Sequence, residues 1–316
     1  MPKKIKLNSK NFNAFSSHTG RRAFVTSLTK VLGTSVFLAA PVVSLASSLG
    51  AEAKTFTVRQ IIDLFIKEVP GAPFEQTVDT LKSGNLDQKV TGIVTSMFAS
   101  LEVIQKAISL GANFIIAHEP TFYNHQDETT WLENDKVYRY KADLLKKHNI
   151  AIWRNHDYIH QHKPDGVQTG LVAALGWGKY YNPENRNRFV IPPTTLKTLI
   201  ALTKEKLNMQ MVRYIGDLSQ SCQRVLFMPG ASGGKRHIEQ MGQEQPDVLI
   251  CGEAPEWETV EYVRDARTKG DKLALVILGH IPSEEPGSEW LVNWLKPKLP
   301  GLKITHVPAQ NPLNFI

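Results

Sequence analysis

Imidazole and carboxylate side chains are grouped at three places along this 316-residue chain. Six of the ten histidines fall between residues 118 and 162, and several have an acidic residue one or four positions later. The three groups are His118-Glu119, His156-Asp157 with His160 close behind, and His280 with Glu284. Imidazole nitrogen and carboxylate oxygen are the donors that borderline divalent ions bind in proteins. The residue types therefore predict a metal site.

Each group follows a short apolar run that is typical of a buried parallel strand. The runs cover residues 114–117, 150–153 and 273–278. Because ligands gather beyond the carboxyl ends of parallel strands, we expect the three groups to meet at one edge of a sheet. Taken singly, a histidine after a strand is more often a structural residue, and a His/Glu pair four residues apart is usually solvated. The coincidence of three groups favours metal, and carboxylates would be needed to bridge two ions ~3.5–4 Å apart.

Helical and extended segments alternate along residues 54–316, which predicts an α/β fold. Strands are expected at 92–95, 114–117, 150–153, 209–214, 225–228, 248–251, 273–278 and 302–306, and the last helix at 288–294. The polar stretch 178–195 holds Pro183, Pro192 and Pro193 and is the best internal boundary. We therefore expect two lobes with largely parallel sheets flanked by helices, over residues 54–188 and 189–316.

The first 53 residues have the pattern of a signal peptide. Seven lysines and arginines precede an uncharged apolar segment, and Ala51-Glu52-Ala53 offers a small-x-small cleavage site. Arg21-Arg22 followed by Ala-Phe-Val resembles the twin-arginine signal. A retained anchor is the alternative, but a spanning helix needs ~20 mostly apolar residues and Pro41 interrupts this segment. We expect a periplasmic or secreted protein, exported by the twin-arginine route, with no stable membrane anchor after cleavage.

Net charge argues against a nucleic-acid partner once the leader is set aside. The whole chain carries 37 basic and 30 acidic residues, whereas residues 54–316 carry 30 and 29. The mature chain therefore lacks the basic excess that binding to a phosphate backbone requires. Its two cysteines, Cys222 and Cys251, adjoin expected strands. A disulfide bridge between them is the alternative, but two buried thiols are the favoured state.

Four longer segments resemble the signatures of the Nif-three-like family, also known as GTP cyclohydrolase 1 type 2. They are 90–123, with Gly111-Ala-Asn-Phe-Ile-Ile-Ala-His-Glu-Pro; 156–177, with Asp165-Gly-Val and Ala174-Leu-Gly-Trp; 247–253; and 279–284. Their order and gaps match the family over nearly all of residues 55–316. The resemblance implies a two-lobed Nif-three-like fold, a dinuclear metal site between the lobes and a ring-like homohexamer.

The resemblance also assigns metal ligands. The family pattern is a His-His pair, an Asp four residues after a His, and a final His-x-x-x-Glu. It maps onto His118, Glu119, His160, His280 and Glu284. Glu119 replaces the second His of the pair and His160 replaces the Asp, so three imidazoles and two carboxylates remain. We expect two divalent ions, chosen from Zn, Mn, Fe or Ni, since no thiolate lies near the site.

A metal-dependent hydrolase of an unknown small molecule is the leading hypothesis, in which metal lowers the pKa of water from ~15.7 toward ~7. His156, Asp157 and Glu253 are the expected catalytic residues, because they could relay protons. Asp157 is also a candidate bridge between the ions, and Glu253 a candidate ligand or support for one. The alternative is a non-catalytic metal-binding or scaffold protein. The cyclohydrolase name carries little weight here, because GTP is cytosolic.

The segment 230–236, Gly-Ala-Ser-Gly-Gly-Lys-Arg, resembles a nucleotide phosphate loop only superficially. Its spacing is wrong, and Arg236 stands where Ser or Thr would hold magnesium. A plain tight turn is the simpler interpretation, although a Gly-rich turn before a helix can receive an anion. Trp257, Trp290 and Trp294 are expected in the core or in a subunit contact.

Overall fold

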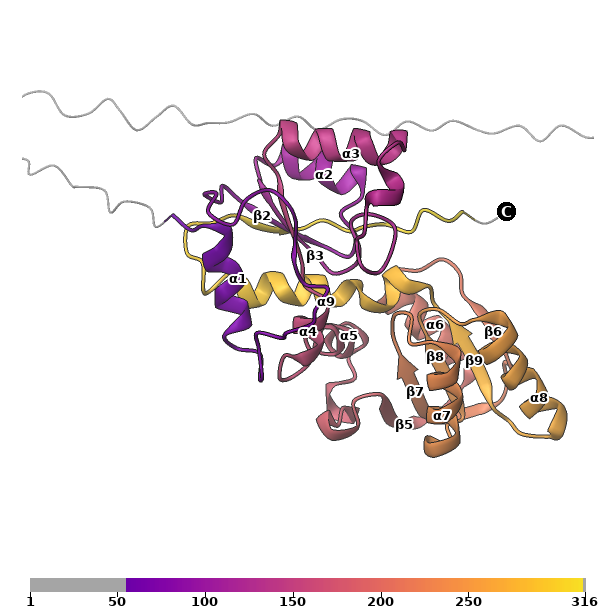
Figure 1. The fold of residues 1–316 in the computed structure, drawn as a ribbon. Coiled ribbons are helices and arrows are strands. Elements are labelled where there is room, and N and C mark those ends of the chain that lie inside the picture. Colours follow the sequence, from indigo (N-terminus) through magenta and orange to yellow (C-terminus); the bar gives the residue numbers. More distant parts are fainter. Residues whose placement is uncertain (1–54, 315–316) are drawn as a thin grey trace, which may run out of the picture. The chain divides into compact units, whose positions relative to one another are not determined.

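The computed structural model describes residues 55–314, which form two five-stranded sheets flanked by helices (Figure 1). The expected α/β fold with two helix-flanked sheets is confirmed. The expected signal peptide, with its Arg21-Arg22 pair and its cleavage site, lies outside the described residues. Within the described part of the chain, no helix has both the length and the apolar character to cross a membrane.

Four parallel strands and one antiparallel edge strand form the first sheet, in the order β1-β4-β3-β2-β10. The strands are β1 (Leu81–Ser83), β2 (Ile93–Ser96), β3 (Phe114–Ala117), β4 (Ala151–Arg154) and β10 (Ile304–His306). All residues of β2, β3 and β4 are buried, because helices cover both faces. The helices are α2 (Leu101–Ser109) and α3 (Lys136–Lys147) on one face, and α1 (Val58–Ile66) and the end of α9 (His280–Leu295) on the other.

The second sheet has three parallel central strands and two antiparallel edges, in the order β5-β7-β8-β9-β6. Its strands are β5 (Arg188–Thr195), β6 (Arg213–Ile215), β7 (Ser221–Met228), β8 (Val248–Cys251) and β9 (Ala274–Ile277). The helices α5 (Gly166–Leu175) and α6 (Leu196–Lys206) pack on one face, and α7 (Gly234–Glu244) and α8 (Glu261–Lys269) on the other. Cys222 and Cys251 are free, buried thiols in β7 and β8, as favoured.

Local capping signals place several helix boundaries where the sequence predicts them. Thr57 Oγ1 accepts a hydrogen bond from the backbone N–H of Gln60, and Gln60 Oε1 accepts one from the backbone N–H of Thr57, a capping box that begins α1. Ser100 caps α2 with a single bond, which its side chain accepts from the Val103 N–H. Gly176 ends α5 in a left-handed conformation, with φ at +69°, which glycine adopts without steric cost.

Two predicted element boundaries are wrong. The stretch 178–195 ends in β5, which contains Pro192 and Pro193, and its pairing with β7 is irregular between Val190 and Thr194. Proline is tolerated there because β5 is an edge strand, where a missing N–H costs little. The last helix begins at His280 rather than at residue 288, and it contains Pro286.

The expected second lobe over residues 189–316 needs correction at its end. The last strand, β10, pairs in parallel with β2, so Ile304–His306 completes the first sheet. Short strands paired across a long sequence separation are not visible in a local pattern. The described chain therefore leaves the first sheet after β4 and returns to it only at its C-terminal end.

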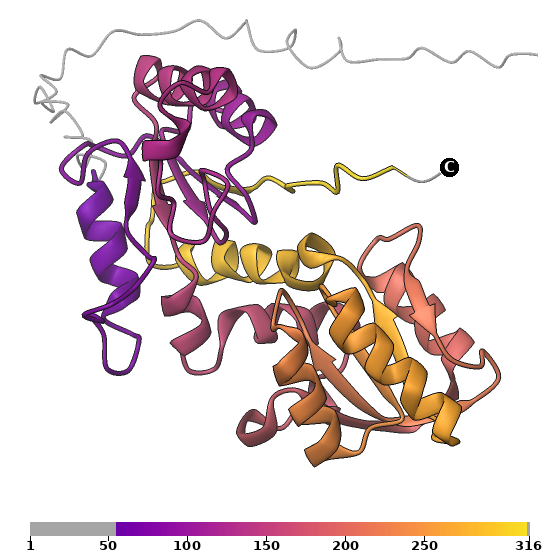
Figure 2. The ribbon, with the colours of Figure 1, turned by 45° about the vertical axis from the view of Figure 1, so that its right-hand side comes forward.

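The helix α9 runs between the two sheets, as both ribbon views show (Figures 1 and 2). It lies very close to α5: a Cβ added to Gly170 would lie 2.2 Å from Pro286 O, and one added to Gly287 would lie 2.8 Å from Val167 Cα. Thr95 of β2 donates a hydrogen bond to Ser288 O at 2.8 Å. The middle of α9 is thereby fixed next to the carboxyl end of β2.

Candidate metal centre

Strands of the first sheet deliver five of the predicted site residues, Asp157 at the start of a short helix among them. β3 leads directly into His118 and Glu119, both of which are buried. β4 leads to His156, which precedes the short helix α4 (Asp157–Gln161), and α4 carries His160. The structure thus brings the two predicted groups of the first lobe to the same edge of the sheet, as parallel strands require.

The second sheet supplies the remaining two predicted ligands through α9. β9 ends at Ile277, and Gly279 turns the chain with φ at +90° so that α9 begins at His280. Glu284 follows one helical turn later and is buried. The side chains at i and i+4 share one face of a helix, so the imidazole and the carboxylate are neighbours.

Two imidazoles and two carboxylates form a closed ring of donor atoms, which we call the mixed cluster. Glu284 Oε2 lies 3.3 Å from His118 Nε2 and 3.0 Å from His280 Nε2. Glu119 Oε1 lies 3.1 Å from His280 Nε2 and 3.9 Å from His118 Nε2. Donors bound to one ion at about 2.0–2.2 Å stand at such distances from each other. The mixed cluster therefore has dimensions suited to a metal ion.

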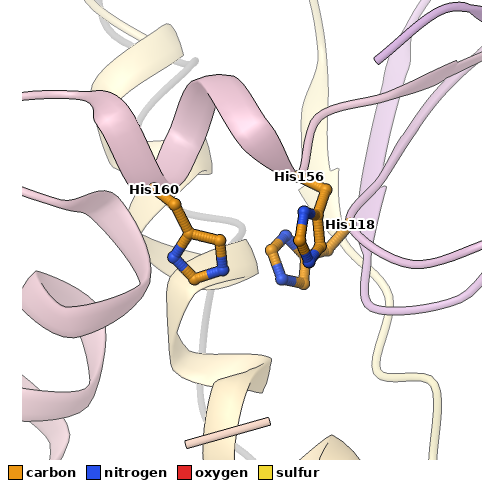
Figure 3. A group of neighbouring side chains, drawn as sticks. All are labelled: His118, His156 and His160. Carbon is orange, nitrogen blue, oxygen red and sulfur yellow. The ribbon is translucent and has the colours of Figure 1, made fainter. Parts of the chain in front are cut away.

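Three histidines form a second group, the histidine trio (Figure 3). Ligand nitrogens of His118, His156 and His160 lie within 4.8 Å of one another. The ring of His118 stacks on that of His156, with centroids 4.8 Å apart, and the ring of His160 meets both edge-on. His118 belongs to both groups, and one imidazole nitrogen binds one ion. The trio and the mixed cluster are therefore two overlapping groups of one centre.

The Nδ1 atom of each histidine is occupied by a hydrogen-bond acceptor. His118 Nδ1 lies 3.2 Å from Asn155 O, and the other three face carboxylates: His156 with Asp157 at 2.9 Å, His160 with Asp165 at 3.1 Å and His280 with Glu253 at 2.8 Å. A carbonyl or an ionised carboxylate can only accept, so each Nδ1 carries the proton. The Nε2 atoms are left as the ligand atoms, and the acceptors fix the ring orientations.

This arrangement defines the positions of the three predicted catalytic residues. His156 stands among the ligand histidines, with its Nε2 3.7 Å from Glu119 Oε1. Asp157 and Glu253 each hold an Nδ1 atom, and both are partly exposed to solvent. Asp157 also accepts hydrogen bonds from Thr77 Oγ1 and from the Val78 amide. Asp157 therefore supports His156 and does not lie between the candidate ligands, where a bridging carboxylate would have to be.

Two supporting residues are not predicted from the sequence. Asp79 accepts hydrogen bonds from the amides of His156 and Tyr158, both at 2.7 Å, and so anchors the start of α4. Arg154, the fully buried last residue of β4, donates to His118 O at 3.3 Å and to Glu119 Oε2 at 3.3 Å. No local sequence pattern points to Asp79. Arg154 does have such a signal, because an arginine at the end of an apolar strand needs a buried hydrogen-bond acceptor.

The charges of the mixed cluster depend strongly on one another. Burial opposes charge on His118 and His280, but hydrogen bonds to the surrounding glutamates outweigh it and raise their pKa values to about 9 and about 12. Burial likewise opposes charge on Glu119, yet its bond to His280 and the nearby imidazoles lower its pKa to about 2. His156 differs, since burial and its histidine neighbours lower its pKa to about 4. Positive charge close to these buried carboxylates therefore stabilises their ionised form.

A divalent ion would supply that charge, and the residues fit one. His118 Nε2 is buried and makes no well-formed hydrogen bond within the described residues, although Glu284 Oε2 is 3.3 Å away. A buried imidazole nitrogen without a hydrogen-bond partner destabilises the folded state, unless another group binds it. Nitrogen and oxygen donors without thiolate suit zinc and its first-row neighbours.

The family model for Duf34/NIF3 (NGG1p interacting factor 3) matches residues 57–312 of this chain. The chain belongs to the Duf34/NIF3 family. The resemblance found in the sequence motifs is therefore confirmed.

Curated and solved members of the Duf34/NIF3 family agree with this assignment. The chain is 26% identical over 238 residues to an Escherichia coli (strain K12) protein named GTP cyclohydrolase 1 type 2 homolog, covering 71% of this chain and 87% of the relative. A Clostridium acetobutylicum protein of the same name is 25% identical over 217 residues, covering 65% and 76%. The fold matches that of Staphylococcus aureus hypothetical protein SA1388, with a TM-score of 0.66, 20% identity and coverage of 83% and 100%.

Both positions at which the expected ligand pattern changes have their own partners. Glu119 is held by Arg154, and His160 is held by Asp165. Asp165 in turn accepts a hydrogen bond from Arg186 at 2.6 Å. The two exchanged ligands are therefore built into hydrogen-bond networks, which supports an intact centre with altered donors.

Proposed function

We propose that this Duf34/NIF3 chain binds two divalent ions at four histidines and two glutamates and uses them to hydrolyse a small molecule. One observation carries the proposal: four imidazoles have Nδ1 held by acceptors, which leaves Nε2 as the ligand atom, and two buried glutamates complete the donor set. When bound, the ions would act as Lewis acids and lower the pKa of water toward ~7, so that it can attack at neutral pH.

The donor set can be divided between two ions without sharing a nitrogen. His118, His280 and Glu284 would hold one ion in the mixed cluster, and His156 and His160 would hold the other. Glu119 Oε1 stands between these two groups, 3.1 Å from His280 Nε2 and 3.7 Å from His156 Nε2. We assign Glu119 as the bridging carboxylate, because the spacing lets one oxygen serve both groups.

Proton transfer is assigned to the carboxylates that face solvent. Asp157 lines the cavity beside the trio, and its side chain is about one-third exposed. Glu253 is more than half exposed and holds His280 Nδ1. Each carboxylate can therefore accept a proton at the edge of the centre and release it to bulk water.

Elemental analysis and a substrate panel test this function together. We expect about two ions per chain and turnover of at least one member of a panel of phosphoesters, amides and nucleotides. His280→Ala should lose metal and turnover, while His148→Ala, which removes an exposed histidine at the end of α3, should keep both. Full metal content with no turnover across the panel would show a binding protein and refute the hydrolase.

A further inference from the structure

A cavity of about 540 Å³ opens beside the histidine trio. His156, His160 and Glu284 line it on the side of the centre, and Arg186, Ser232 and Arg236 line it elsewhere. Its volume lies in the range of pockets that hold small molecules. Because three residues of the centre form part of its wall, a molecule in this cavity would reach the site of the proposed hydrolysis.

The two arginines of the cavity differ in what surrounds them. Arg186 Nη1 donates to Asp165 Oδ2 at 2.6 Å and to His160 O at 3.3 Å, so its charge is compensated and its position is fixed. Arg236 lies in the first turn of α7, and no carboxylate oxygen within residues 55–314 lies within 4.0 Å of it. Arg236 is therefore the cation that remains available to a ligand in this cavity.

The loop before α7 is fixed against the metal centre. The Gly230 amide donates to Ser283 Oγ at 3.0 Å, and the Glu253 amide donates to Gly230 O at 2.9 Å. A Cβ added to Gly230 would lie 2.4 Å from Glu284 Oε1. The loop that leads to Ser232 and Arg236 thus touches the carboxylate of a proposed ligand, so the backbone at the start of this loop keeps a constant spacing from the centre.

We propose that this cavity binds small molecules that carry a phosphate group, with Arg236 and Ser232 holding the phosphate and the rest of the molecule lying toward the centre. This rests on the proposed function, and it names the substrate class. A guanidinium forms two parallel hydrogen bonds with a phosphate. The Ser232 hydroxyl, which donates to Pro229 O at 3.3 Å in the structure, would turn from that carbonyl to add a third donor. Asp165 compensates Arg186, and Asp157 and Glu284 add carboxylates to the wall, so among the residues that the structure describes Arg236 is the free positive charge for an anion, apart from the ions themselves.

Calorimetric titration with inorganic phosphate tests the proposal in the metal-loaded protein. Arg236→Gln should weaken phosphate binding about 10-fold or more, as expected for loss of a charged hydrogen-bond donor. Lys235→Gln is the matched control, because it removes the same charge one residue away, from a side chain that is 89% exposed and does not line the cavity. It should leave the dissociation constant within about twofold of the wild type.

The titration overturns the proposal if phosphate does not bind the wild type, if Arg236→Gln binds it as well as the wild type does, which would place the phosphate on the ions alone, or if both variants lose affinity equally. A parallel titration with acetate separates phosphate from carboxylate: an effect of Arg236→Gln on acetate alone would also refute it. These titrations follow binding and not turnover, so the hydrolase can fail while this proposal stands.

Discussion

Arg154 binds one carboxylate oxygen of Glu119, and the other oxygen faces His280. Arg154 Nη2 lies 3.3 Å from Glu119 Oε2, while Oε1 faces His280 Nε2 at 3.1 Å. The guanidinium is fully buried and also approaches Asp127 Oδ2 at 3.7 Å. Glu119 can therefore bind metal only through Oε1, and Arg154 sets the orientation of its carboxylate.

Arg154→Met should therefore weaken metal binding about 10–100-fold, the usual effect of losing a group that orients a ligand. It should also lower the free energy of unfolding by roughly 3–5 kcal/mol, because Glu119 would be left as a buried charge without its partner. Competition with a chelator measures the first effect and urea unfolding of the metal-free protein measures the second. An affinity within threefold of the wild type would contradict the positioning role.

Arg224→Met provides the control for loss of an arginine. Arg224 pairs with Asp247 at 2.7 Å, but its side chain is half exposed, so its loss should cost only about 0–1 kcal/mol. The double variant Arg154→Met with Glu119→Gln should recover part of the lost stability, because it removes both buried charges. Recovery of metal affinity is not expected, since a glutamine amide is a poor ligand.

Exchanging the two unusual ligands tests whether they compensate for each other. Glu119→His alone leaves one carboxylate in the ligand set, and His160→Asp alone leaves three. The double variant restores the proposed total of four imidazoles, His156 included, and two carboxylates, so elemental analysis should show more metal than in either single variant. It should stay below the wild type, because Arg154 would face an imidazole and Asp165 would face a carboxylate. Equal metal content in all three variants would show that the two positions are not coupled.

The burial of Lys141 predicts that the free energy of unfolding rises at alkaline pH. Its side chain is only 4% exposed, and Nζ donates to Thr121 O at 2.6 Å. Burial lowers its pKa from 10.5 to about 8, against a smaller opposing effect of Asp127. Between these values the unfolded chain binds more protons than the folded chain, so stability rises with pH. Relative to Lys141→Met, the wild type should gain up to about 3 kcal/mol between pH 8 and 10.5.

Denaturant unfolding at several pH values measures this difference. Lys146→Met, which removes an exposed lysine from the same helix, should run parallel to the wild type across the whole range. A difference between wild type and Lys141→Met that does not change with pH would mean that Lys141 is no more difficult to charge in the folded chain than in water.

The leader predicts export of an already folded protein. Arg21-Arg22 precedes a weak apolar segment, and a centre built from residues 118, 160 and 280 presents its ligands together only in the folded chain. Replacing both arginines by lysine keeps the charge and removes the pair. We expect the precursor to accumulate unprocessed in the cytoplasm, as followed by fractionation and blotting. Export and processing at the wild-type level would show that the pair merely supplies positive charge.

Short-range patterns in the sequence were enough to predict most strands and the ligand groups. The runs before His118, His156 and His280 are apolar because helices cover both faces of each sheet, and such runs are visible in any window of the chain. The helical start of α9 was hidden by Pro286 and the glycines that let α9 approach α5. Asp79 could not be predicted, because its hydrogen bonds to α4 cross 77 and 79 positions of sequence.

The C-terminal strand has a consequence for the order of events during synthesis. β10 pairs with β2, and the bond between His306 and Thr95 joins positions 211 residues apart. A ribosome therefore releases β2, β3 and β4 long before their sheet can receive its edge strand, and the second sheet must be translated in between. His280 and Glu284 also emerge late. The mixed cluster should thus remain without metal until late in translation, and a premature stop codon near residue 300 would leave an open edge on β2 that invites aggregation.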